Sequence, residues 1–107
     1  MSEKDARVAQ VFLALADPTR RAVMARLSEG PVTATELAEG LPVSRQAVAK
    51  HLAALETAGL VASERHGRER QFRLTPGPLA AAMEWMTGVG SEWDERLQAL
   101  RKHLESP

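Results

Sequence analysis

The stretch LPVSRQAVAKHLAAL (residues 41–55) decides how this chain folds. Its apolar side chains recur in steps of four and three residues: Val48, Leu52 and Leu55. That spacing brings them to one side of a helix and predicts a buried face. The opposite side carries Gln46 and Lys50 among alanines. A helix of this kind can pack on a core while its bare side approaches a partner closely.

A second helix is expected immediately before this one. Thr33 and Glu36 have the spacing of a capping box, in which the hydroxyl and the carboxylate satisfy free backbone amides at a helix start. This short helix meets Gly40, and Pro42 prevents its continuation before Ser44 offers a new N-cap. Two helices joined by a turn of a few residues form a helix-turn-helix arrangement.

Two further helices are expected upstream. The first, at about residues 3–16, has an apolar stripe at helical spacing: Val8, Val11, Phe12 and Leu15. Asp17 and Pro18 then suit the N-cap and the first position of another helix. That helix is expected to direct three residues inward and to stop at Gly30: Val23, Met24 and Leu27.

A β-hairpin is expected after the helix of residues 44–58, which Gly59 ends as a left-handed cap. The runs LVASERH and RQFRL alternate with period two, which predicts one buried face: Leu60, Ala62, Phe72 and Leu74. Gly67 lies between the runs, and the hairpin tip is basic: Arg65, Arg68 and Arg70.

Composition narrows the functional classes. The 107 residues suit one domain spanning residues 1–107, and the absence of cysteine excludes disulfides and thiolate metal sites. The 14 basic and 14 acidic residues exclude a uniformly basic nucleic-acid binder, but residues 41–75 are net positive. No catalytic constellation stands out, so no enzyme and no cofactor are expected. With no apolar run of about 20 residues and no secretory start, a cytoplasmic protein is expected.

The C-terminal segment carries an apolar seam with heptad spacing. Its members are Leu79, Met83, Met86, Trp93, Leu97, Leu100 and Leu104, with Gly90 as the one gap. The seam needs a partner, which is either a second copy of the chain or the chain's own first helix. Gly88 and Gly90 weaken a helix there, so one long helix or two collinear pieces remain open.

The bare helix face is suited to the major groove of DNA, where Gln reads adenine and Lys reads guanine. The N-terminal part of the second helix of a helix-turn-helix enters that groove, and basic residues on the hairpin reach phosphates. The expected DNA contacts are Ser44, Arg45, Gln46, Ala47, Lys50, His51, Arg65, Arg68 and Arg70. Arg20 and Arg21 are expected either to touch phosphate or to pair with Asp17 or Glu36.

Three stretches together resemble the ArsR family of bacterial winged-helix transcriptional regulators: LALADPTRRAVMARL, TELAEGLPVSRQAVAKHLAALETAGLV and ERHGRERQFRL. The resemblance implies a mainly α fold of about five helices with a two-stranded wing. It implies operator binding as a homodimer, usually in repression. It also implies dimerisation through the first helix and the last helix, at about residues 78–104. The expected interface comprises Val8, Phe12 and the seam residues named above.

The chain departs from the metal-sensing members of that family. No cysteine is available, and Asp94, His103 and Glu105 lack the two-histidine spacing of the zinc sensors. Ligands nine residues apart face opposite sides of a helix, so no metal site is expected. The effector, whether a small molecule or a protein, stays open. A winged helix that binds only proteins is the alternative, but residues 44–57 offer none of the aromatic anchors typical of such surfaces.

Overall fold

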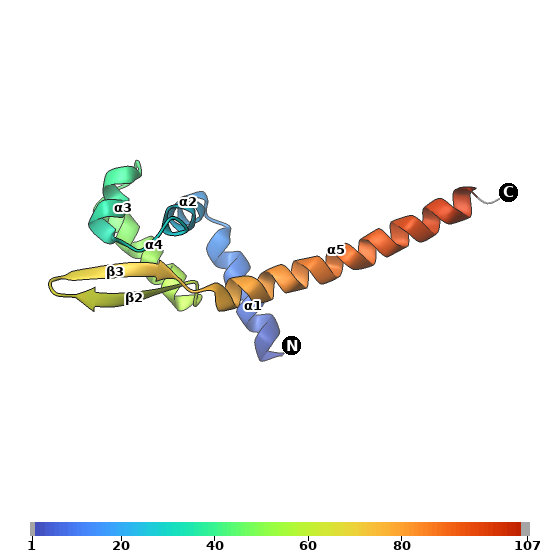
Figure 1. The fold of residues 1–107 in the computed structure, drawn as a ribbon, viewed down its shortest axis with the longest axis horizontal. Helices are drawn as coiled ribbons and strands as arrows, with labels where there is room; N and C mark the ends of the chain where they lie inside the picture. The colour runs from blue at the N-terminus through green and yellow to red at the C-terminus, as the bar shows by residue number, and fades with distance from the viewer. Residues whose placement is uncertain (1, 106–107) are drawn as a thin grey trace.

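Five helices and three short strands follow one another in the computed structural model, which describes residues 2–105 (Figure 1). In chain order they are α1 (Glu3–Leu15), α2 (Pro18–Leu27), β1 (Val32–Thr33), α3 (Ala34–Gly40), α4 (Arg45–Thr57), β2 (Val61–His66), β3 (Glu69–Leu74) and α5 (Pro76–Glu105). The mainly α fold with a winged hairpin is confirmed. Strand β1 was not predicted; it makes the hairpin a three-stranded antiparallel sheet in the order β1-β3-β2.

The predicted caps set the helix starts. The Asp17 carboxylate accepts hydrogen bonds from the amides of Thr19 (2.8 Å) and Arg20 (3.1 Å) at the start of α2. The Thr33 hydroxyl accepts from the Glu36 amide (3.1 Å), and the Glu36 carboxylate accepts from the Thr33 amide (3.2 Å), which completes the capping box of α3. These contacts satisfy amides that the helices leave free.

Phe72 and Leu74 lie on the inner face of the sheet as predicted, but the phase of β2 differs by one residue from the prediction. Val61 pairs with Leu74 and Ser63 with Phe72, so these residues share the inner face of the sheet. Ala62, expected on that face, lies on the other one. Leu60 is buried, but it precedes β2, and its carbonyl accepts from the Thr75 amide at 2.9 Å. Because Leu60 is buried although it lies before β2, counting it as part of the strand shifted the predicted alternation by one residue.

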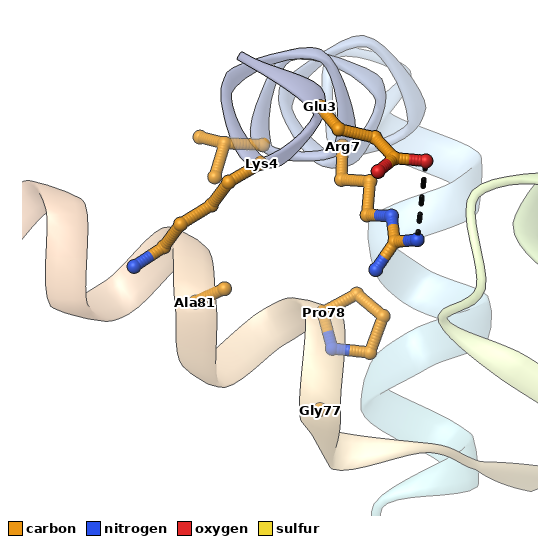
Figure 2. A pocket seen from close by; sticks show the side chains of 7 residues that line it. Glu3, Lys4, Arg7, Gly77, Pro78 and Ala81 are labelled. Atoms are coloured by element: carbon orange, nitrogen blue, oxygen red, sulfur yellow. Dashed lines mark ion pairs between the residues drawn. The ribbon is translucent and has the colours of Figure 1, made fainter.

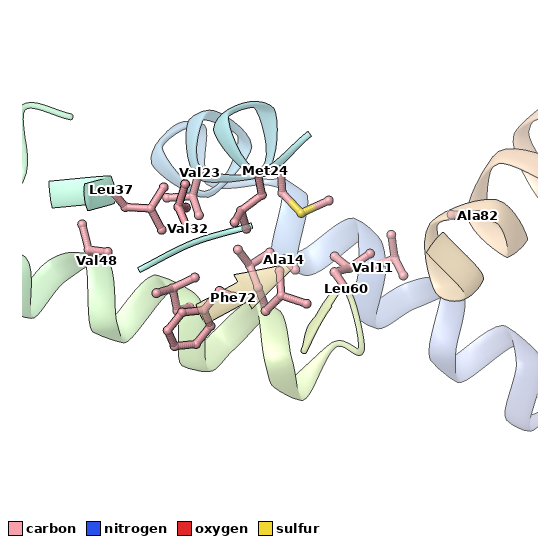
Figure 3. Close-up of a cluster of buried hydrophobic side chains, with 14 of the residues drawn as sticks. Val11, Ala14, Val23, Met24, Val32, Leu37, Val48, Leu60, Phe72 and Ala82 are labelled. Atoms are coloured by element: carbon pink, nitrogen blue, oxygen red, sulfur yellow. The ribbon is translucent and has the colours of Figure 1, made fainter. Parts of the chain in front are cut away.

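The core lies between α1, α2, α3, α4 and the sheet (Figure 3). Its fully buried side chains are Val11, Val23, Leu37, Val48, Leu52, Leu55 and Leu60. Phe72 adds the wing to this core, and Ala82 is the buried residue that α5 contributes. The core therefore fixes α4 through its predicted apolar face and leaves the opposite side of α4 outside.

Helix α5 is continuous through Gly88 and Gly90 and projects away from the rest of the molecule (Figure 1). Its first half packs on α1, where the rings of Phe12 and Trp85 meet edge to face with centroids 5.7 Å apart. From residue 90 to residue 105 every side chain is exposed. None of the helices in residues 2–105 combines the length and the hydropathy needed to cross a membrane.

Candidate nucleic-acid interface

The outer face of α4 carries two polar side chains among alanines, as the sequence predicts. The Ser44 hydroxyl accepts from the Ala47 amide at 3.1 Å and fixes the first turn of the helix. Val48 and Leu52 are buried below, while Gln46 and Lys50 are exposed. Ala49 and Ala53 are exposed beside them, so few atoms keep a partner away from the backbone. Because the core holds the buried side, this face has a fixed direction.

A hollow of about 540 Å³ lies beside this face, between α3, the start of α4 and the wing. Arg45, Arg68 and Arg70 come from two distant parts of the sequence and all line it. The other lining residues are Thr33, Ala34, Thr35, Glu36, Glu69 and Phe72. The sequence predicted all three as DNA contacts, but not that they line one hollow, because that depends on how the wing packs against the helices.

The wing carries two arginines opposite each other. Arg65 and Arg70 are direct partners across β2 and β3, on the same face of the sheet as Phe72. Like charges in this position destabilise a sheet. The Arg70 guanidinium donates to the Ser63 hydroxyl (2.8 Å), and Arg65 donates to the carbonyl of Gly67 (3.4 Å). Both contacts are with neutral groups, so they position the charges without neutralising them.

The arginines of this surface keep their positive charge available. Within residues 2–105, no ion pair involves any of them: Arg45, Arg65, Arg68 and Arg70. Arg68 occupies the two-residue turn of the hairpin, where Gly67 adopts a φ of +64° that favours glycine. An unneutralised cluster of guanidinium groups is suited to bind phosphate, because the planar group donates two parallel hydrogen bonds.

His51 is half-buried on α4, which packs on α2, and lies close enough to Asp17 for their charges to interact. Its charge contributes to the low pKa of Asp17. The pKa of Asp17 lies below its ordinary value mainly because the Arg20 amide donates a hydrogen bond to the carboxylate. Burial raises this pKa, whereas the Thr19 amide and, to a smaller extent, the charge of His51 lower it further. The expected contact of His51 with DNA stays a prediction.

Arg20 and Arg21 have a role that the sequence did not predict. Their guanidinium groups donate to the carbonyls of Ala14 (3.4 Å) and Leu15 (2.7 Å), at the end of α1. Helix α1 has no basic residue in its own last turn, so these side chains satisfy carbonyls that the helix leaves free. Within residues 2–105 no ion pair of 4.0 Å or less joins either guanidinium to Asp17 or Glu36, although the charge of Arg20 helps to lower the pKa of Asp17. The expected phosphate contact stays a prediction.

The predicted interface residues fall into two groups. Phe12, Met83, Met86, Trp93, Leu97, Leu100 and Leu104 are exposed apolar side chains. Val8 is only 8% exposed and packs within its own chain, and Leu79 packs on the edge of the core. The second group therefore has little surface to offer a second copy, while the first has much.

The donor side chains do not fit a metal centre. Residues 2–105 contain no group of three or more His, Cys, Asp or Glu side chains placed to share an ion. Asp94, His103 and Glu105, the candidates in the last helix, are all exposed and form no such group.

The proteins of known family or structure that resemble this chain are transcriptional regulators. A family model described as a helix-turn-helix domain matches residues 15–64. The HTH-type transcriptional regulator Rv2034 of Mycobacterium tuberculosis is 53% identical over 91% of this chain and 88% of its own length. The transcriptional repressor SdpR of Bacillus subtilis is 31% identical over 81% of this chain and 97% of its own. An ArsR-like transcriptional regulator of known structure from Rhodococcus sp. RHA1 shares 42% identity and a TM-score of 0.84, covering 99% of this chain and all of the other.

Proposed function

Because the chain belongs to the ArsR family of winged helix-turn-helix, DNA-binding transcriptional regulators, a class that is not enzymatic, we propose that it is a repressor. In this proposal it binds a pseudo-palindromic operator as a homodimer and needs no metal. The observation that carries the proposal is the bare outer face of α4 beside the arginine-lined hollow of the wing.

Each residue of this surface has a distinct role in the proposal. Gln46 and Lys50 hydrogen-bond base edges in the major groove, and Ser44 and Ala47 allow the first turn of α4 to approach closely. His51 contacts backbone phosphate or orients the helix. The remaining residues bind phosphate and set the register of the protein on the duplex: Arg45, Arg65, Arg68 and Arg70.

The exposed seam of α5 supports the homodimer. Leu97, Leu100 and Leu104 continue the heptad pattern far beyond the last contact of α5 with α1. A second α5 related by a two-fold axis offers the same seam and covers these side chains. The first and last helices are then the dimerisation elements, and the two copies of α4 reach half-sites about 34 Å apart.

Two observations support repression without a metal. The relative SdpR is named a transcriptional repressor, and it shares most of this chain's length. The chain has no cysteine, and its described residues offer no cluster of three metal ligands. Zinc sites in proteins normally use three or four such ligands.

Selection from a random DNA pool tests the proposal. Protein treated with a chelator is mixed with the pool, and the bound duplexes are recovered and sequenced. We expect an inverted repeat without added metal. Enrichment only after zinc is added would contradict metal independence, and a lone half-site would contradict the dimer. No enrichment under either condition, even at low salt, would contradict sequence-specific binding.

A further inference from the structure

A second hollow, of about 450 Å³, opens between α1 and the first turns of α5 (Figure 2). It is lined by Glu3, Lys4, Arg7, Val8, Gly77, Pro78 and Ala81, and is called the α1–α5 pocket below. None of these residues belongs to α4 or to the wing. Its volume is within the range of small-molecule sites. We propose that the α1–α5 pocket binds a small organic carboxylate with a short apolar body.

The floor of the pocket is apolar and firmly held. Val8 is buried, and Pro78 and Ala81 are half-buried below the opening. The Pro78 ring lies so close to Gly59 that a Cβ added there would meet Pro78 Cγ at 3.2 Å. A proline ring held against the end of α4 does not collapse into an empty pocket. The floor can therefore cover the apolar part of a ligand without first being rearranged.

Two cations stand above this floor. Figure 2 shows Lys4 and Arg7 extending from α1 on either side of the opening, with Pro78 and Ala81 beneath. The Arg7 guanidinium is 3.7 Å from the Glu3 carboxylate, and the Lys4 ammonium is 4.0 Å from the Glu84 carboxylate. These four side chains are mostly exposed, so the pairs contribute little stability and can exchange partners. A ligand carboxylate can replace Glu3 on Arg7 and bind the guanidinium through two parallel hydrogen bonds.

The pocket stays open if the seam of α5 is covered. Successive residues of a helix are about 100° apart, so Gly77 and Ala81 lie on the side of α5 opposite Leu97. Pro78 lies on a side closer to the seam, but it forms the floor of the pocket against Gly59. On α1, likewise, Glu3 and Arg7 face away from the side that carries Phe12. A ligand therefore need not compete with a second copy of the chain for this site.

The position of the pocket links it to DNA binding, and this step rests on the proposed function. Its walls are α1 and α5, the two helices that carry the predicted dimer interface. A ligand between them favours the relative placement of α1 and α5 seen here, and with it one spacing of the two α4 helices. Any such coupling is reciprocal, so the carboxylate binds DNA-free and DNA-bound protein with different affinities.

Titration of the DNA-free protein tests the site itself. ¹⁵N-labelled protein is titrated with sodium hexanoate, and parallel titrations use acetate, which lacks the apolar body, and hexanol, which lacks the charge. We expect hexanoate to give saturable shifts of the amides of Lys4, Arg7, Gly77 and Ala81. Acetate and hexanol should bind at least about tenfold more weakly.

Paired variants identify the groups that bind the carboxylate. Arg7→Gln should weaken hexanoate binding about tenfold, whereas Glu3→Gln should tighten it because it removes the competing carboxylate. Arg26→Gln and Glu29→Gln make the same changes in another pair (3.4 Å), at the C-terminal end of α2, and should have no effect. Gly77→Leu should block the pocket, because Gly77 lines it. A Cβ at Gly77 meets no atom within 4 Å, so the substitution itself causes no clash at Cβ.

The outcomes separate this proposal from the proposed function. No saturable shift at the pocket, or equal binding by Arg7→Gln and wild type, would overturn the carboxylate site whether or not the protein binds DNA. The dissociation constant for the selected operator should change more than about threefold at saturating hexanoate, and not in Arg7→Gln. An unchanged constant in wild type would overturn the link to DNA binding while the shifts still report the site.

Discussion

The body of the protein (residues 2–89) and the far half of α5 (residues 90–105) both carry leucines at helical spacing, but they differ in how far these are buried. In the body, leucines at helical spacing are buried, as Leu52 is with 1% of its surface exposed. In the far half of α5, Leu97 and Leu100 have the same spacing but are 58% and 55% exposed. Apolar periodicity therefore identifies a face that must be covered, but not whether the chain itself or a second copy covers it.

The largest expected effect is on the free energy of unfolding, which should respond differently to substitutions in the two regions. Leu52→Ala should lower the free energy of unfolding by about 2–5 kcal/mol at every protein concentration, because it leaves a cavity in the core. Leu100→Ala should act only by weakening association, so its deficit should shrink as the protein is diluted. Denaturant unfolding at several concentrations measures both. A deficit for Leu100→Ala that does not vary with concentration would contradict its role in association.

The next largest effect is on base recognition, which we expect only for residues in the body of the protein. Gln46→Ala and Lys50→Ala should each cost about 1–3 kcal/mol in binding to the operator and relax its sequence preference. Gln98→Ala removes the same kind of side chain from the far half of α5 and should leave binding unchanged. Titrations of specific and random duplexes measure the difference. Equal losses on both duplexes would remove Gln46 and Lys50 from base contact.

A smaller effect concerns phosphate contact by the wing. Arg68→Gln should weaken binding to all sequences alike and lower the slope of log affinity against log salt by about one. Arg101→Gln makes the same change on the far half of α5 and should not alter the slope. Binding measured across a salt series provides the test, and an unchanged slope for Arg68→Gln would move this residue away from the phosphates.

The smallest expected effect is on the pH dependence of stability, and it arises only in the body of the protein. Amide hydrogen bonds, that of Arg20 first, hold the pKa of Asp17 below its ordinary value of 3.8. The ionised carboxylate therefore stabilises α2 fully above that value, and its contribution is lost as the pH falls through the lower pKa of the folded state. The difference in Tm between wild type and Asp17→Ala should shrink below about pH 4. A constant difference down to pH 2 would contradict this role.

Local signals made much of the fold predictable from the sequence. Asp17, Thr33, Glu36 and Ser44 cap helices because a cap depends on a few neighbouring residues. The buried face of α4 follows from its periodicity. Strand β1 was missed because two residues carry no period of their own and become a strand only by pairing with β3.

The exposed face of α4 was predictable residue by residue, but the arrangement of the arginines around it was not. Ser44, Gln46 and Lys50 follow from helix geometry, whereas the hollow that joins Arg45 to the wing arginines depends on tertiary packing. Gly88 and Gly90 left the continuity of α5 open. Two glycines cost about 2 kcal/mol relative to alanine, which a 30-residue helix tolerates.

The central claim is that the far half of α5 is covered by a second copy of the chain. Sedimentation equilibrium of wild type, Leu97→Glu and Gln98→Glu tests it directly, since the last variant adds the same charge away from the seam. Wild type and Gln98→Glu should have twice the chain mass of 11.7 kDa, and Leu97→Glu should have 11.7 kDa. A mass for Leu97→Glu equal to that of wild type would contradict the claim.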